Sequence, residues 1–138
     1  MDKQVIATKE APAAVGPYSQ AIRLGNLIFT AGQVGLVPGT KELAGTDTAT
    51  QARQALENVK AILEAAGSCL EHVVKATVFL QDINDYAKVN EIYAQFFTKD
   101  FPARSAVQVA ALPLGARVEI EVVAEACDCN SPEDCDCS

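Results

Sequence analysis

The stretch from Thr48 to Gly67 limits the folds open to this chain most strongly. Its apolar residues recur at intervals of three and four, which places them on one face of a helix. Thr48 and Gln51 have the spacing of a capping box, and Gly67 is typical of a left-handed helix end. Residues 73–80 follow, rich in β-branched and aromatic side chains, which is typical of a central strand. The two segments together predict a helix-covered sheet.

The other segments add strands and a second helix, which also has a single apolar side. Asn90 is a polar exception on that side, and Gly25-Asn26 fits a type II′ hairpin turn. The element order predicts an α+β domain with a mixed sheet and both helices packed on one face. The expected elements are strands at 5–7, 21–24, 27–31, 73–80, 105–111 and 117–124, helices at 48–66 and 82–97, and a loop at 32–45.

The last two strands are expected to form a hairpin through residues 112–116. Strand alternation then places Arg104 and Glu119 on the same side of the sheet, together with Arg117 and Glu121. A sheet face of this half-polar kind is either solvated or in contact with another subunit.

Arg104 is the leading functional candidate among these residues. An unpaired charge beside an apolar strand is costly, so its guanidinium needs a partner. One reading is an internal ion pair with Glu119 or Glu121. The other is a pocket for the carboxylate of a small acid, because the planar guanidinium binds carboxylates through two parallel hydrogen bonds.

Charge and composition exclude several classes of function. The formal net charge is −7, of which the five acidic residues from Glu125 onward carry −5, leaving −2 for residues 1–124. A nearly neutral body without a basic stripe does not favour nucleic-acid or membrane binding. The start lacks a secretory signal, so a cytosolic location without disulfides is the default, and a mitochondrial location is left open. His72 is the single histidine and is expected to be structural.

The C-terminal tail, residues 125–138, is rich in cysteine and acidic residues. It holds two Cys-Asp-Cys sequences, whose thiolates could close a tetrahedral site for Zn²⁺ or Cu⁺. The alternative is a solvated tail without a dedicated metal, which the unusual Cys-x-Cys spacing favours. Cys69 stands apart and is expected to be a small buried side chain. The tail thiolates are Cys127, Cys129, Cys135 and Cys137.

Five short motifs occur in order along residues 3 to 124, and together they are specific. With them the chain resembles the Rid family of reactive intermediate deaminases, which places a Rid-type domain at 1–124 ahead of the tail. The motifs are Gly-Pro-Tyr-Ser-Gln at 16–20, Thr-Ala-Gly-Gln at 30–33, Val-Asn-Glu at 89–91, Phe-Pro-Ala-Arg-Ser at 101–105 and Arg-Val-Glu-Ile-Glu at 117–121.

This resemblance implies a homotrimer of chorismate-mutase-like α+β chains, with a central barrel and active sites between subunits. It implies hydrolysis of 2-iminobutanoate and 2-iminopropanoate, imine and enamine intermediates released by pyridoxal-phosphate enzymes, to 2-oxo acids and ammonia. No cofactor is expected, and the substrates are small imino acids. The alternative is a module that binds small carboxylates, or a chaperone or translation inhibitor, without turnover.

The resemblance also implies roles for individual residues. Arg104 would bind the substrate carboxylate, Glu119 would position or deprotonate the attacking water, and Tyr18 would close the pocket. Asn90 would add a polar contact, and Gly32 would let the backbone approach the ligand.

Two positions depart from the family pattern. Ala31 stands where many members have Ser, so a hydroxyl contact to the substrate is missing. Ala106 stands where many have Cys, and its backbone is expected to orient water. Both remain candidate substrate-binding positions.

Overall fold

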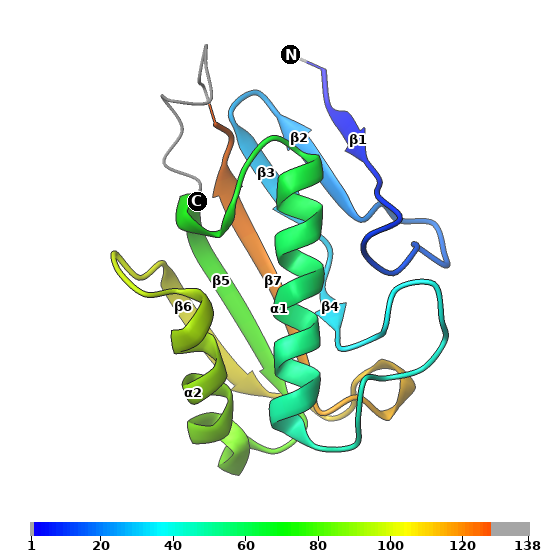
Figure 1. The fold of residues 1–138 in the computed structure, drawn as a ribbon, viewed down its shortest axis with the longest axis vertical. Coiled ribbons are helices and arrows are strands. Elements are labelled where there is room, and N and C mark those ends of the chain that lie inside the picture. The colour runs from blue at the N-terminus through cyan, green and yellow to red at the C-terminus, as the bar shows by residue number, and fades with distance from the viewer. Residues whose placement is uncertain (1, 128–138) are drawn as a thin grey trace.

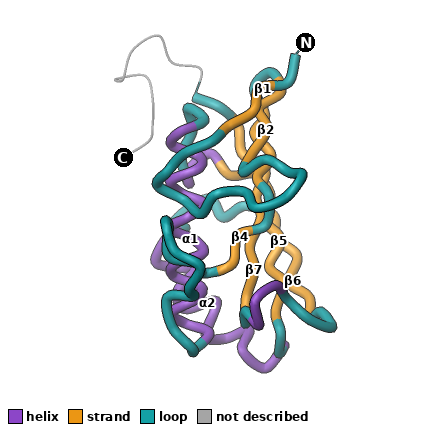
Figure 2. The backbone as a smooth tube through the Cα atoms, turned by 90° about the vertical axis from the view of Figure 1, so that its right-hand side faces the viewer, coloured by secondary structure: helices purple, strands orange, loops and turns teal. Residues whose placement is uncertain are grey.

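The computed structural model describes residues 2–127, in which two helices cover one face of a single mixed sheet (Figures 1 and 2). The expected α+β class, with both helices on one face, is confirmed. In chain order the elements are β1 (Gln4–Ile6), β2 (Ala21–Leu24), β3 (Leu27–Thr30), β4 (Gln33–Val34), α1 (Thr48–Ala65), η1 (Leu70–His72), β5 (Val73–Leu80), η2 (Ile83–Asp85), α2 (Tyr86–Phe96), β6 (Ala103–Gln108), η3 (Pro113–Gly115) and β7 (Val118–Glu125).

The strand order corrects one expectation from the sequence. The order is β1-β2-β3-β7-β5-β6, and β4 also pairs with β7. β6 lies parallel to β5 at the edge, whereas β7 is antiparallel to both β3 and β5. The expected hairpin of the last two strands is therefore wrong, because β5 separates them. A strand reached through a helical crossover returns parallel to the strand before it, and α2 is such a crossover.

The start of α1 differs from the expected capping box. The carboxylate of Asp47 accepts hydrogen bonds from the backbone N–H and the hydroxyl of Thr50, both at 2.9 Å. Asp47, not Thr48, is thus the N-cap. Gln51 is used elsewhere, since its amide donates to the carbonyl of Gly45 and accepts from the backbone N–H of Arg117.

Two turns have the backbone that the sequence predicts. Gly67 has a φ of 83°, and the N–H of Ser68 donates to the carbonyl of Leu63, which closes α1 with a Schellman motif. Gly25 has a φ of 61° and joins β2 to β3. Asn26 is not among the positive-φ residues, as a type II′ turn requires.

Strand β4 lies inside the segment expected to be a loop. It is two residues long, which is too short for an alternating pattern to reveal. The backbone of Gln51 runs so close to Gly35 that a side chain there would collide with it. The buried amide of Asn58 donates to the carbonyl of Leu36 at 2.9 Å. Both contacts hold this segment against α1.

The core lies between the helices and the sheet. Leu56, Val59 and Leu63 of α1 are fully buried, as are Val78 and Ile120 on the sheet surface that they cover. No helix among residues 2–127 is long and apolar enough to cross a membrane.

The other sheet face is open and half apolar. Leu27, Phe29 and Val107 lie on it, each with about two fifths of its surface exposed. Glu119 and Glu121 interrupt the apolar surface from β7. Sheets whose side chains are this apolar are normally covered, so this face is where a further chain would be expected to pack.

Candidate active site

Arg104 lies on the edge strand β6, beside α2. It is in register with Ala76, a fully buried residue of the helix-covered face, so its side chain belongs to that face. Its Nη2 donates to the hydroxyl of Tyr86 at 2.8 Å. The guanidinium carbon is 5.3 Å from the ring centre of Tyr86 and 4.7 Å from that of Tyr93. Two aromatic rings therefore hold the cation without neutralising it.

The charge of Arg104 is not paired with a carboxylate within the described residues. Both ion pairs found in residues 2–127 involve Asp85, whose partners are Lys88 and Arg117. The internal pair with Glu119 or Glu121, one of the two readings from the sequence, is not formed. The guanidinium keeps donors that a bound carboxylate would accept.

Glu119 lies on the open face of the sheet, next to Gly32. Any side chain at Gly32 would collide with the Glu119 carboxylate, so the glycine leaves the space that the carboxylate occupies. Partial burial raises the pKa of Glu119, and the like charge of Glu121 raises it further. A carboxylate with a raised pKa is suited to exchange protons with a reacting water.

Arg104 and Glu119 do not line the same side of the sheet, contrary to the expectation from strand alternation. Glu119 is in register with Phe79 on β5, whereas Arg104 is in register with Ala76, three residues away and on the opposite face. The strands β6 and β7 are two strand spacings apart, about 10 Å. One chain therefore does not bring the two side chains into one pocket.

Asn90 and Ala106 belong to the same side of the molecule as Arg104. Asn90 is on α2, four residues after Tyr86 and three before Tyr93, so it shares their helix face. It is partly buried, as is Ala106, which lies two residues after Arg104 on the same face of β6. These three candidates therefore lie on one side of the molecule, at the edge of the sheet next to α2.

Of the other candidates, Gly32 lies against Glu119, and Tyr18 lies in a loop that is tied to Ala31, the neighbour of Gly32. Tyr18 is in the loop between β1 and β2, with 53% of its surface exposed. Its hydroxyl accepts a hydrogen bond from the backbone N–H of Val15 at 3.4 Å. The N–H of Ala31 donates to the carbonyl of Gln20, which ties this loop to the end of β3. Glu119, with Gly32 against it, thus lies on the sheet face opposite to that of Arg104.

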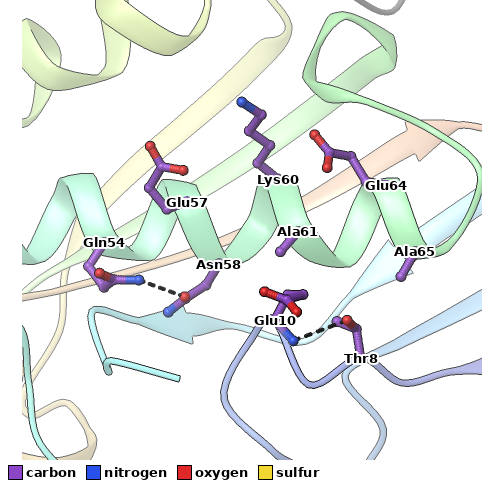
Figure 3. A pocket seen from close by; sticks show the side chains of 9 residues that line it. All are labelled: Thr8, Glu10, Gln54, Glu57, Asn58, Lys60, Ala61, Glu64 and Ala65. Atoms are coloured by element: carbon purple, nitrogen blue, oxygen red, sulfur yellow. Dashed lines mark hydrogen bonds between the residues drawn. The ribbon is translucent and has the colours of Figure 1, made fainter. Parts of the chain in front are cut away.

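Among the described residues, three surface cavities have linings that include none of Tyr18, Arg104 and Glu119. One of these three, with a volume of about 500 Å³, lies between α1 and the segment after β1 (Figure 3). Figure 3 shows its lining to be mainly polar helix-surface residues, with Gln54 donating to Asn58 at 2.9 Å. Its lining residues are Thr8, Glu10, Gln54, Glu57, Asn58, Lys60, Ala61, Glu64 and Ala65.

Sequence reasoning missed Tyr86 and Tyr93 as partners of Arg104. Tyr93 is buried, which raises the pKa of its hydroxyl, and that hydroxyl makes no hydrogen bond within the described structure. The signal was present, because two tyrosines flank Asn90 on one helix face.

Arg117 has a structural position instead of one on the open face. It precedes β7, and its side chain donates to the hydroxyl of Thr48 at 2.9 Å and to the carboxylate of Asp85 at 3.1 Å. Thr48 also donates to Asp85 at 2.6 Å. The Thr48 hydrogen bond chiefly lowers the pKa of Asp85, with help from Arg117 and Lys88 and against the effect of burial. This network joins the starts of α1, α2 and β7.

The cysteines correct a further expectation. Cys69 is buried, as expected, but it is disulfide-bonded, which the sequence did not predict. Cys127 is partly buried and its sulfur lies 3.4 Å from Nδ1 of His72. The other tail cysteines, Cys129, Cys135 and Cys137, lie outside the described residues.

Comparison with known proteins places this chain in a family. The model of the endoribonuclease L-PSP family matches residues 8–126, and the chain belongs to that family. Over 124 residues it is 53% identical to the 2-iminobutanoate/2-iminopropanoate deaminase of Escherichia coli K12, covering 88% of this chain and 96% of the relative. The human protein of the same name is 52% identical over 122 residues, covering 88% and 89%. The Rid resemblance is confirmed.

A solved structure supports the fold independently. The structure of E. coli TdcF with bound serine superposes with a TM-score of 0.85 at 46% identity, covering 90% of this chain and 99% of that one.

Proposed function

We propose that the chain is a deaminase that hydrolyses small 2-imino acids to 2-oxo acids and ammonia without a cofactor. The observation that carries the proposal is the state of Arg104. Its guanidinium is held by Tyr86 and Tyr93 and has no carboxylate partner within the described residues. The carboxylate of a substrate would accept hydrogen bonds from this guanidinium and neutralise its charge. The deaminases named above, at about half identity over most of the chain, support this substrate class.

The chemistry asks little of the protein beyond orientation and proton transfer. Arg104 binds the substrate carboxylate, and Glu119 accepts a proton from the water that attacks the imine carbon. The C–O bond forms as the C=N electrons move to nitrogen, giving a carbinolamine. With the imine protonated at the start, the proton on Glu119 then passes to the carbinolamine nitrogen, and ammonia leaves as the C=O bond forms and the hydroxyl proton returns to the Glu119 carboxylate. The raised pKa of Glu119 suits both transfers.

A site of this kind needs two copies of the chain. One half-site, with Arg104, Asn90 and Ala106, lies on the helix-covered side near the β6 edge, and the other, with Glu119 and Gly32, lies on the open side. A homotrimer in which the open sheet faces meet would bury Leu27 and Phe29 and bring each half-site against the complementary half of a neighbour. The active sites of this proposal are therefore intersubunit sites.

A second candidate is a module that binds small carboxylates without turnover. The solved structure of TdcF with bound serine favours it, since that ligand carries a carboxylate and is not an imine. This function would use Arg104 but would not require Glu119.

The test measures loss of 2-iminobutanoate, generated in place by an excess of threonine dehydratase, with semicarbazide trapping the residual imine. Wild type should accelerate imine loss and ammonia release, and Arg104→Ala should not. Arg53→Ala is the matched control, because Arg53 is exposed on α1 and bonds only to Gln95 among the described side-chain hydrogen bonds. If wild type removes the imine no faster than the blank but still binds serine, the deaminase proposal fails and the carboxylate-binding module remains.

A further inference from the structure

A cluster of thiol and imidazole groups lies where the end of β7 passes the connection between α1 and β5. The sulfurs of Cys69 and Cys127 and a ring nitrogen of His72 lie within 4.8 Å of one another. These are the ligand types that Zn²⁺ prefers in proteins. The cluster contains none of the candidate active-site residues, so a role for it is independent of the proposed function.

A short helical turn aligns two of the three groups. Cys69 is the N-cap of the 3₁₀ turn η1, and His72 is its last residue. Side chains three residues apart in a 3₁₀ turn lie on the same side. The N–H of His72 donates to the carbonyl of Cys69 at 3.1 Å, which fixes the turn. Cys-Leu-Glu-His at 69–72 thus presents sulfur and imidazole in one direction.

Backbone hydrogen bonds bring the third group to this turn. The N–H of Cys127 donates to the carbonyl of Gly67 at 2.8 Å. Two residues earlier, the carbonyl of Glu125 accepts from the hydroxyl of Ser68 at 2.7 Å. Cys127 is therefore held against the connection by one backbone hydrogen bond and, through Glu125, by one from the Ser68 hydroxyl, independently of any ion.

The distances are close to those that a shared ion imposes. With Zn–S near 2.3 Å and Zn–N near 2.0–2.1 Å, tetrahedral ligands have a sulfur–nitrogen separation of about 3.6 Å. The observed distance from the sulfur of Cys127 to Nδ1 of His72 is 3.4 Å. If the sulfurs of Cys69 and Cys127 are the full 4.8 Å apart, they must move about 1 Å closer to reach the separation of two sulfurs bound to one zinc.

We propose that Cys69, His72 and Cys127 bind one thiophilic divalent ion, Zn²⁺, with solvent at the fourth position. Two sulfurs and an imidazole disfavour Mg²⁺ and Ca²⁺, which take oxygen ligands. Cys69 is buried, whereas His72 and Cys127 are partly exposed, which gives the ion a path to the site. The bound ion joins the start of β5 to the residues that follow β7.

The disulfide of Cys69 makes this site dependent on redox state. Cys69 is disulfide-bonded in the structure, and a sulfur in a disulfide is not a thiolate ligand. A dithiol reductant transfers two electrons and two protons to the disulfide, releasing two thiols and becoming a disulfide itself. The Cys69 and Cys127 thiols lose their protons to solvent as the ion binds. The oxidised chain therefore does not bind the ion, whereas the reduced chain does.

The test titrates the full-length chain with Zn²⁺ alone, in competition with a chromophoric chelator, after reduction by a phosphine. Co²⁺ in place of Zn²⁺ reports thiolate ligation by its charge-transfer absorption. The variants are His72→Ala and, as the matched control, Cys135→Ser with Cys137→Ser, which removes tail thiols and keeps all three proposed ligands. Deaminase turnover of His72→Ala, expected to equal wild type, verifies that this variant folds.

Reduced wild type should bind one Zn²⁺ per chain, and the oxidised chain should not bind it. His72→Ala should weaken binding at least about tenfold, since even indirect partners of a metal ligand contribute 10–100-fold in affinity. The tail variant should bind as wild type does. Equal affinity of His72→Ala and wild type overturns the site, as does loss of binding in the tail variant alone, which would assign the ion to the tail. No binding by reduced wild type also overturns it and leaves a thiol–imidazole hydrogen bond.

Discussion

The Glu119 carboxylate occupies the space that a side chain on Gly32 would need. This contact, between the connection that leaves β3 and the start of β7, sets the position of the proposed general base. It also explains why a glycine is needed there, since Gly32 has no positive φ to account for it.

Gly32→Ala should displace Glu119 and lower kcat/KM for the imine by about 100-fold, because a shift of about 1 Å in a reacting group has a cost of that order. Gly39→Ala is the control: Gly39 has a φ of 78° but no atom within reach of an added Cβ. It should reduce thermal stability slightly and leave turnover unchanged. Steady-state kinetics and thermal unfolding of both variants separate the two effects. Full activity of Gly32→Ala would show that Glu119 is not positioned by this contact.

Tyr86→Phe should lower kcat/KM by about tenfold, the order expected for one hydrogen bond to a charged group. The lost bond is the 2.8 Å contact that orients Arg104. The change should fall mainly on KM, since the same contact serves substrate and transition state alike. Tyr93→Phe keeps the ring and removes a hydroxyl that makes no hydrogen bond within the described residues, so its effect should be smaller. A larger loss of kcat/KM in Tyr93→Phe than in Tyr86→Phe would argue against the Tyr86 contact.

The pH dependence of turnover should report the raised pKa of Glu119. Activity requires the deprotonated carboxylate, so kcat/KM should fall as pH decreases through a pKa above the ordinary value of 4.5. Glu121→Gln removes the like charge that helps to raise this pKa, and should move the acidic limb to lower pH. A limb that does not move would exclude Glu119 as the titrating group.

The same pKa has a consequence for stability. A carboxyl with a higher pKa in the folded state favours folding below its unfolded pKa and loses that contribution as pH rises through the folded pKa. Glu119→Gln should therefore raise the melting temperature at neutral pH, and the gain should vanish below about pH 4. Thermal scans across pH test this, and a lower melting temperature at neutral pH would contradict it.

Asp85→Ala should destabilise the fold by about 2–3 kcal/mol, because it removes charged hydrogen bonds and leaves Arg117 without its partner. The pKa of Asp85 is lowered, so its contribution is present above the ordinary value of 3.8 and is lost as pH falls through the lowered one. Denaturant unfolding at neutral pH measures the loss. Asp47→Ala, which removes only an exposed helix cap, should cost less. Equal losses would mean that the buried network adds nothing.

The sequence was sufficient for elements whose signals are local. The apolar periodicity of α1, its Gly67 end and the Gly25 turn depend on residues within a few positions of one another. The pairing of strands depends on residues far apart in the chain. Alternation shows which residues of β6 and β7 share a face, but it does not show that β5 lies between these two strands. For that reason Arg104 and Glu119 were expected on one side of the sheet and lie on opposite sides.

The candidate site was predictable as a set of residues but not as a geometry. Arg104 was identified from its guanidinium chemistry, whereas its Tyr86 and Tyr93 partners come from a helix that packs beside it. The cluster of Cys69, His72 and Cys127 was missed for the same reason, because residues 58 positions apart meet only through the sheet.

Subunit complementation tests whether the site is shared between copies. Arg104→Ala and Glu119→Gln chains, each inactive alone, are co-expressed with different tags and the mixed assemblies are purified. If each site takes Arg104 from one copy and Glu119 from another, some sites receive both intact residues. Random assembly should then restore about a quarter of wild-type activity. Mixed assemblies as inactive as either parent would contradict the shared site and require both residues to act within a single chain.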